Sequence, residues 1–88
     1  MKTVHKYLLA ANTSYLTLPQ GAKPLDIQFQ GMQEPVIWFE VNTENPAAQR
    51  EVYFVGTGNP VPPCTEYAGT FQIENEGLVF HVYLGEER

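Results

Sequence analysis

The chain has 88 residues, of which 43% are apolar and 17% are charged, a balance that excludes a disordered polypeptide. The net charge is −5 and the five basic residues do not cluster beyond Lys2 and Lys6, so the sequence lacks the basic stripe of nucleic-acid-binding proteins. No run reaches the roughly 18 apolar residues that span a bilayer, and we expect one small domain over residues 1–88 with neither a nucleic-acid nor a membrane partner.

Seven segments of the chain have the pattern of short β-strands. In the third segment Leu25, Ile27 and Phe29 share one face and polar residues share the other, which is the period of two of a half-buried strand. Turns rich in proline and glycine separate the segments. In chain order the expected strands are residues 3–8, 13–18, 25–30, 35–41, 51–55, 66–73 and 78–84. This spacing predicts an all-β fold of mainly antiparallel strands in a small sandwich or barrel.

Three of these strands, at residues 35–41, 51–55 and 78–84, are apolar on both faces. Such strands need cover on both faces, and the chain offers almost no helix to supply it. The cover therefore comes from a second sheet or from another subunit, and we expect a homo-oligomer. Aromatic residues with a polar tip are favoured at interfaces. The predicted interface residues are Trp38, Tyr53 and Tyr83.

The connection at residues 42–50 is expected to contain a short helical turn and no longer helix. Asn45 is a suitable N-cap, and Pro46 suits the first helical position because its missing N–H is not needed there.

The sixth strand is expected to place Tyr67, Phe71 and Ile73 on one face, with Gly69 leaving a gap in that row. A hairpin turn at residues 74–77 then leads into the last strand.

The loop that begins at Gly56 is the most distinctive local feature. Glycines allow backbone N–H groups to turn toward an anion, but a phosphate-binding P-loop would continue into a helix with a Lys, and prolines follow here instead. The loop is thus either a weak phosphate or nucleotide nest or a connection that needs positive φ. His81, within an apolar strand, faces either a cavity or an interface. The candidate ligand-binding residues are Gly56, Thr57, Gly58, Asn59 and His81.

The remaining reactive side chains do not form a motif for catalysis. His5, His81 and Cys64 lack the spacing of metal ligands, so we expect neither a metal nor a cofactor. Cys64 has no neighbouring cation to lower a thiol pKa and is expected to be a bystander. A single cysteine fits a reducing cytoplasm, where we place the protein. We expect no enzymatic activity.

Short motifs along nearly the whole chain resemble, in order, those of a family of short phage and prophage proteins of unknown function. These motifs are Lys2-Thr3-Val4-His5-Lys6-Tyr7, Leu18-Pro19-Gln20-Gly21-Ala22, Trp38, Val55-Gly56-Thr57-Gly58-Asn59-Pro60, Gly69-Thr70-Phe71-Gln72 and Leu78-Val79-Phe80-His81-Val82. The resemblance implies a phage or prophage origin and no particular activity.

A phage origin favours an accessory protein that binds something. The expected function is to counter host defence, either by sequestering a small nucleotide-type signal or by binding a host protein. The alternative is a minor structural or assembly component of the virion. All three are expectations by analogy of context.

Overall fold

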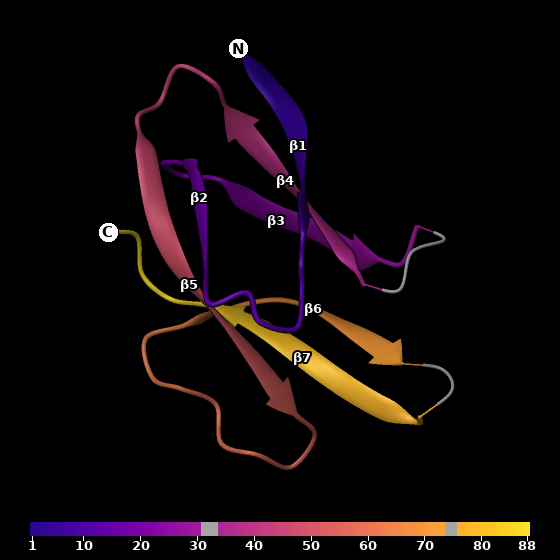
Figure 1. Ribbon diagram of the computed structural model, residues 1–88. Helices are drawn as coiled ribbons and strands as arrows, with labels where there is room; N and C mark the ends of the chain where they lie inside the picture. The colour runs from indigo at the N-terminus through magenta and orange to yellow at the C-terminus, as the bar shows by residue number, and fades with distance from the viewer. Residues whose placement is uncertain (31–33, 74–75) are drawn as a thin grey trace.

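Seven antiparallel strands form two sheets in the computed structural model, which describes residues 1–30, 34–73 and 76–88 (Figure 1). The three-stranded sheet has the order β1 (Lys2–Leu8), β4 (Val36–Asn42), β3 (Lys23–Gln28). The four-stranded sheet has the order β2 (Tyr15–Pro19), β5 (Ala47–Gly56), β7 (Leu78–Leu84), β6 (Glu66–Ile73). The predicted small all-β sandwich is confirmed.

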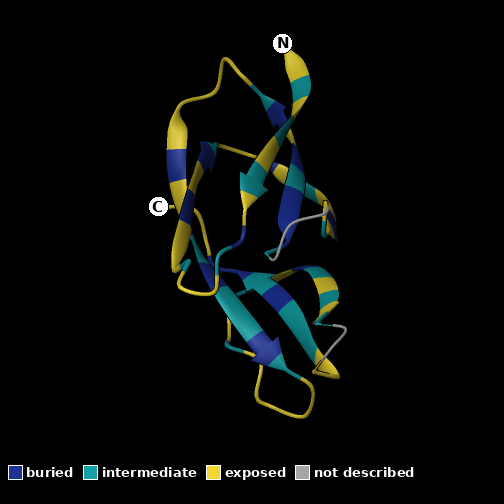
Figure 2. Cartoon of the chain, turned by 45° about the vertical axis from the view of Figure 1, so that its right-hand side comes forward, coloured by how far each residue is buried: buried dark blue, intermediate teal, exposed yellow. Residues whose placement is uncertain are grey.

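The hydrophobic core lies between the inner faces of the two sheets. Ile37 and Phe39, at the centre of β4, are completely buried. The principal side chains packed around them come from both sheets and the first connection: Leu9, Leu16, Leu18, Ile27, Val41, Val52, Val82 and Leu84. Burial is deepest where the sheets overlap, whereas the first half of β7 is exposed or only half-buried (Figure 2). As far as residues 1–30, 34–73 and 76–88 show, the sandwich is therefore incompletely filled at that end.

β3 lies against β6 and closes one side of the sandwich. A Cβ atom on Gly69 would come within 2.8 Å of Ile27 Cδ1, so the Ile27 side chain packs directly on the backbone of β6. Gly69 has a φ of 149°, and the pairing of β6 with β7 shifts register between Tyr67 and Gly69, as at a β-bulge. Only glycine satisfies both requirements.

The helical turn predicted for residues 42–50 is wrong. Asn45 N–H donates to the Asn42 carbonyl (3.1 Å) in a tight turn, and the chain then enters β5 directly. Pairing with β2, where Ala48 lies opposite Leu18, satisfies the backbone and buries Ala48, which a single helical turn does not do. No helix in the described part of the chain is long and apolar enough to cross a membrane.

Two predicted face assignments fail because each falls at a β-bulge. Leu25 lies at the register shift of β3 and is 48% exposed instead of facing the core. Tyr67 lies at the register shift of β6 and is 53% exposed, on the face opposite to Phe71. One extra residue in a strand reverses the side-chain alternation on one side of it.

The predicted turn at residues 74–77 is described only in part, since residues 74 and 75 lie outside the described residues. The N–H groups of Glu76 and Gly77 both donate to the Ile73 carbonyl, at 3.2 and 3.1 Å.

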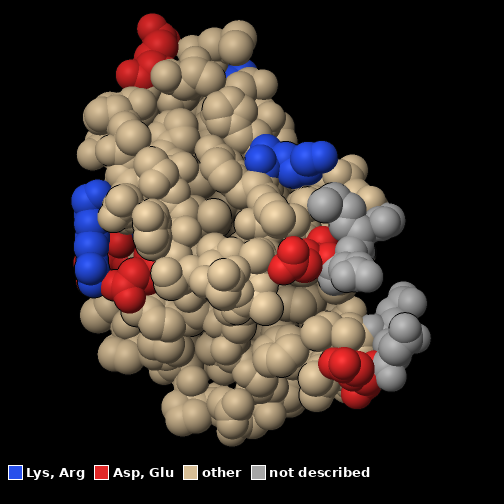
Figure 3. Space-filling model, viewed as in Figure 1, with Lys and Arg blue, Asp and Glu red and all other residues tan. Residues whose placement is uncertain are grey.

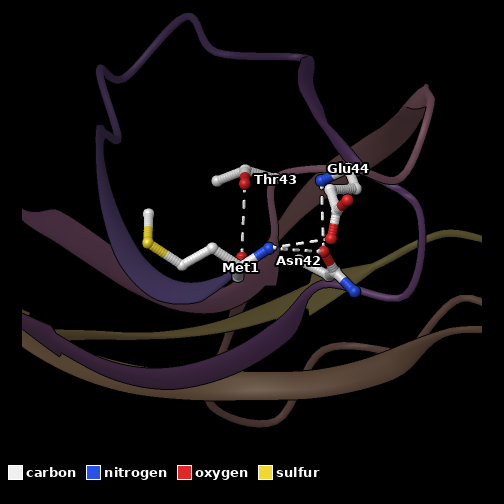
Figure 4. A network of polar contacts seen from close by, with 4 residues as sticks. All are labelled: Met1, Asn42, Thr43 and Glu44. Carbon is white, nitrogen blue, oxygen red and sulfur yellow. Dashed lines mark hydrogen bonds and ion pairs between the residues drawn. The ribbon is translucent and has the colours of Figure 1, made fainter.

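The start of β1 is tied to the turn that follows β4 (Figure 4). The amino group of Met1 donates to Asn42 Oδ1 (3.3 Å) and to Glu44 Oε2 (3.1 Å). The backbone N–H of Thr43 donates to the Met1 carbonyl (3.0 Å), and Asn42 Oδ1 also accepts the Glu44 N–H (3.1 Å). These contacts hold the edge strand β1 against β4.

Candidate functional site

The four-stranded sheet brings all the predicted ligand-binding residues together on its outer face. Val55 and His81 are register partners on β5 and β7, so His81 lies beside the loop that follows β5. The loop and the strands border a shallow, open pocket of about 210 Å³. Its lining consists of Val55, Gly56, Thr57, Gly58, Asn59, Val61, His81 and Tyr83. Tyr83, predicted as an interface residue, thus belongs to the same site.

His81 is held by hydroxyl groups on both sides. Its Nε2 lies 2.9 Å from Thr57 Oγ1 and its Nδ1 lies 2.9 Å from Thr70 Oγ1. Thr70 Oγ1 lies in turn 2.5 Å from the Tyr67 hydroxyl. One chain of hydrogen bonds therefore runs from the loop after β5 across β7 to β6, on the exposed face of the sheet.

This hydrogen-bonded chain fixes the orientation of the imidazole ring. A neutral ring has one donor and one acceptor nitrogen, so one threonine donates to His81 and the other accepts from it. The pair of His81 and Thr57 has the spacing of a base and a hydroxyl nucleophile. However, the second nitrogen faces the Thr70 hydroxyl, where catalytic triads place a carboxylate that stabilises the charged imidazole. The arrangement suits recognition of a partner through preorganised polar groups.

Three tyrosines lie on or beside this chain of hydrogen bonds: Tyr67 is its last member, and Tyr53 and Tyr83 lie next to it. Tyr53 and Tyr83 are register partners on β5 and β7, and the rings of Tyr67 and Tyr83 pack edge to face with centroids 5.5 Å apart. The Tyr53 hydroxyl donates to Glu51 Oε2 (2.7 Å), and this hydrogen bond raises the pKa of Tyr53 above its ordinary value of 10.0. We call the surface formed by Tyr53, Thr57, Tyr67, Thr70, His81 and Tyr83 the tyrosine face.

The conformation of the loop argues for a structural role of its glycines. The N–H of Asn59 donates to the Gly56 carbonyl (3.0 Å), which closes a turn in which Gly58 has a φ of 93°. That turn requires glycine at position 58. Among the described residues that line the pocket, none is Lys or Arg, so a phosphate nest there has no cation to support it.

Trp38, the third predicted interface residue, lies away from the tyrosine face. It is half-buried on β4 and pairs with Lys6 of β1, on the outer face of the three-stranded sheet. The two expected contact surfaces therefore lie on opposite sides of the sandwich.

Sequence reasoning missed Thr70 and placed Tyr67 on the wrong face. The available signal was Gly69, because a glycine inside a strand often marks a β-bulge, and a bulge there reverses the side to which Tyr67 points. Within residues 1–30, 34–73 and 76–88, no group of three or more His, Cys, Asp and Glu side chains is arranged to hold a metal ion. Cys64 is exposed, with a φ of 59°.

Comparison with known proteins gives a match to a family model. The model of a family described as a domain of unknown function, DUF7352, matches residues 1–88. No curated protein matches the chain, and no solved structure matches it.

Proposed function

Because the chain belongs to the DUF7352 family, whose function is unknown, we propose its function from its own surface: it is a non-enzymatic binding protein that holds a partner protein on the tyrosine face. The observation that carries this proposal is the hydrogen-bonded chain from Thr57 through His81 and Thr70 to Tyr67. It orders three exposed side chains and the half-buried His81 before any partner arrives, which lowers the entropy cost of binding.

The chemistry of the tyrosine face favours a protein partner. Tyrosine supplies a large, rigid contact area with a polar tip and is enriched at protein interfaces. The pocket within this face, at about 210 Å³, is smaller than the roughly 300–1,000 Å³ of most ligand pockets. A side chain of a partner fits such a hollow better than a whole nucleotide does.

The distribution of charge is consistent with this kind of partner. In the view of Figure 3 the Lys and Arg side chains lie apart from one another, and one of them is bordered by carboxylates. A nucleic acid needs a continuous basic surface, and a nucleotide needs a local cation. We therefore place a nucleotide-type signal second to a protein as the ligand of the tyrosine face.

The resemblance of the sequence motifs to short phage and prophage proteins suggests the class of partner. We propose that the chain is a phage accessory protein and that the tyrosine face binds a host protein, in the host cytoplasm, to counter a defence response. The alternative, a minor virion component, requires the protein to be present in purified particles.

Site-specific photo-crosslinking in infected host cells tests this proposal. A photoreactive phenylalanine analogue replaces Tyr53 on the tyrosine face, where it leaves the hydrogen bonds from Thr57 to Tyr67 intact, and in a matched protein it replaces Leu25, which is exposed on the other sheet. We expect one crosslinked product of constant mass from position 53 and none from position 25. A further variant carries both the probe on the tyrosine face and the substitution Thr70→Val, which breaks the contact with His81. This variant should lose the crosslinked product while it stays folded by circular dichroism.

Two outcomes would contradict the proposal. Equal products from positions 53 and 25 would mean unspecific contact, and no product from position 53 would mean that the tyrosine face is not a protein-binding surface. In the second case, native mass spectrometry tests for a bound small ligand. Extra mass that disappears on denaturation would mean that the tyrosine face binds a nucleotide-type ligand and not a protein.

A further inference from the structure

An apolar pocket opens between the two sheets at the incompletely filled end of the sandwich. Its volume is about 220 Å³, and its floor is formed by Phe54, Phe71 and Phe80 from the inner face of the four-stranded sheet. These three rings are only half-buried, although the core residues between the sheets are at most 8% exposed. The inner face of a sandwich is normally covered along its length, so this end has an apolar space that no side chain of the described residues fills.

Four phenylalanine rings shape the pocket around Phe71. The centroid of Phe71 lies 5.9 Å from that of Phe29, 6.1 Å from that of Phe54 and 5.8 Å from that of Phe80. The first two contacts are edge to face and the third is tilted. The rings come from the residue that follows β3 and from β5, β6 and β7, so the strands largely fix the shape of the space.

One carboxylate lies on the wall of this pocket. Glu34 Oε2 accepts the backbone N–H of Ala11 at 3.1 Å, and both residues line the pocket. Glu34 is the single ionisable residue among the described residues of the lining. A negative charge therefore stands beside an aromatic floor, and both attract a cation.

We propose that this pocket binds a small arylalkylammonium ligand, with its aromatic ring on the phenylalanine floor and its ammonium group at Glu34. Size supports the assignment, because an apolar cavity of about 150 Å³ holds a benzene molecule and this one has room for a short alkyl chain as well. Charge supports it too, since the carboxylate repels an anionic ligand of the same shape. The pocket lies on the inner side of the sheet and is independent of the tyrosine face.

Two-dimensional ¹H–¹⁵N NMR titration of the whole chain with 2-phenylethylamine tests the proposal, with 3-phenylpropanoate as an anionic ligand of similar size. The amine should produce saturable shifts at the amides of Ala11 and Glu34, and should bind at least about tenfold more tightly than the carboxylate, which is the worth of one charge-assisted hydrogen bond. The absence of saturable shifts with the amine, or equal binding of both ligands, would overturn it.

Three variants separate the roles of charge and shape. Glu34→Gln should weaken binding of the amine about tenfold and leave binding of neutral ethylbenzene unchanged. Glu40→Gln, which removes the same charge from the exposed outer face of β4, should change neither. Ala11→Phe should fill the pocket and abolish both. If Glu34→Gln unfolds the chain, Ala11→Phe still decides, because unchanged binding of the amine in that variant would refute the pocket as the site.

Discussion

Position 69 imposes two requirements, one on the backbone angle and one on side-chain volume, that only glycine meets. Its φ of 149° lies outside the range of ordinary side-chain-bearing residues, and the space where a Cβ would stand is taken by the Ile27 side chain at 2.8 Å. Gly58 makes a useful comparison, because its φ of 93° is also positive but nothing lies within 4 Å of its Cβ position. The difference between the two glycines isolates the steric contact between β3 and β6.

We predict that Gly69→Ala lowers the free energy of unfolding by about 3 kcal/mol, because the strain of positive φ adds to the overpacking against Ile27. Gly58→Ala should lower it by about 1 kcal/mol, from strain alone. Urea denaturation of the three proteins measures both changes. Equal losses for the two variants would mean that Ile27 moves aside freely and that β3 does not depend on Gly69.

At the scale of elements, the segment after β7 is fastened along β5. Gln49 and Arg88 exchange backbone hydrogen bonds (3.1 and 2.9 Å). The side chain of Arg50, which is 8% exposed, donates from Nε to the Gly85 carbonyl (2.7 Å) and from Nη1 to Glu66 Oε1 (2.9 Å). One buried guanidinium thus joins β5, β6 and the end of the chain.

We predict that Arg50→Met lowers the free energy of unfolding by about 2–3 kcal/mol, because the Gly85 carbonyl loses its buried donor and Glu66 loses its counter-charge. Arg88→Met is the control, since Arg88 is mostly exposed and its ion pair with Glu51 contributes less than about 1 kcal/mol. Chemical denaturation compares the two. Similar losses in both variants would show that the Arg50 contacts add no more than a surface ion pair.

The strands were predictable from sequence because their alternation is a local property. Leu16 and Leu18 of β2 point to the core as the pattern indicates. The helical turn at Asn45 and Pro46 was wrong because its signals are also local, whereas the pairing of β5 with β2 that replaces it joins segments about thirty residues apart. Tyr67 was placed on the wrong face because a single extra residue reverses the alternation.

The candidate site was predictable only as separate pieces. The glycine loop and His81 are recognisable in sequence, but their proximity depends on the register of β5 and β7, which pairs Val55 with His81. Thr70 was missed because its position opposite His81 follows from the bulge in β6. The phenylalanine pocket depends on how the two sheets overlap, and no periodicity within one strand reports that.

On the scale of the whole molecule, the protein is a flattened body of 40 × 32 × 19 Å. One broad side carries the tyrosine face. The opposite side is the outer face of the three-stranded sheet, where Val4 and Leu8 are 52% and 45% exposed on β1 beside the half-buried Trp38. Lys2 and Lys6 alternate with these residues on the same face of the edge strand β1, and lysines on an edge strand oppose strand-to-strand pairing between chains. This disfavours a homo-oligomer that pairs through the edge of β1 and leaves the outer face of β1 and β4 as the candidate interface.

We predict that the chain forms a homodimer through the outer face of β1 and β4, with Trp38 in the interface. Trp38 is the single tryptophan of the chain, so its fluorescence reports on that face alone. As the protein concentration rises, the emission should shift to shorter wavelength, because water leaves the indole, while the sedimentation mass doubles. Val4→Lys should keep both signals at their monomer values, and Leu78→Lys, at a similarly exposed position on β7 of the other sheet, should leave dimerisation intact. A doubled mass with unshifted emission would move the interface to the tyrosine face, where it competes with the proposed protein partner. A monomer mass at every concentration would mean that Val4, Leu8 and Trp38 form no interface. The partial burial of Trp38 would then come only from its neighbours on β1 and β3 within the same chain.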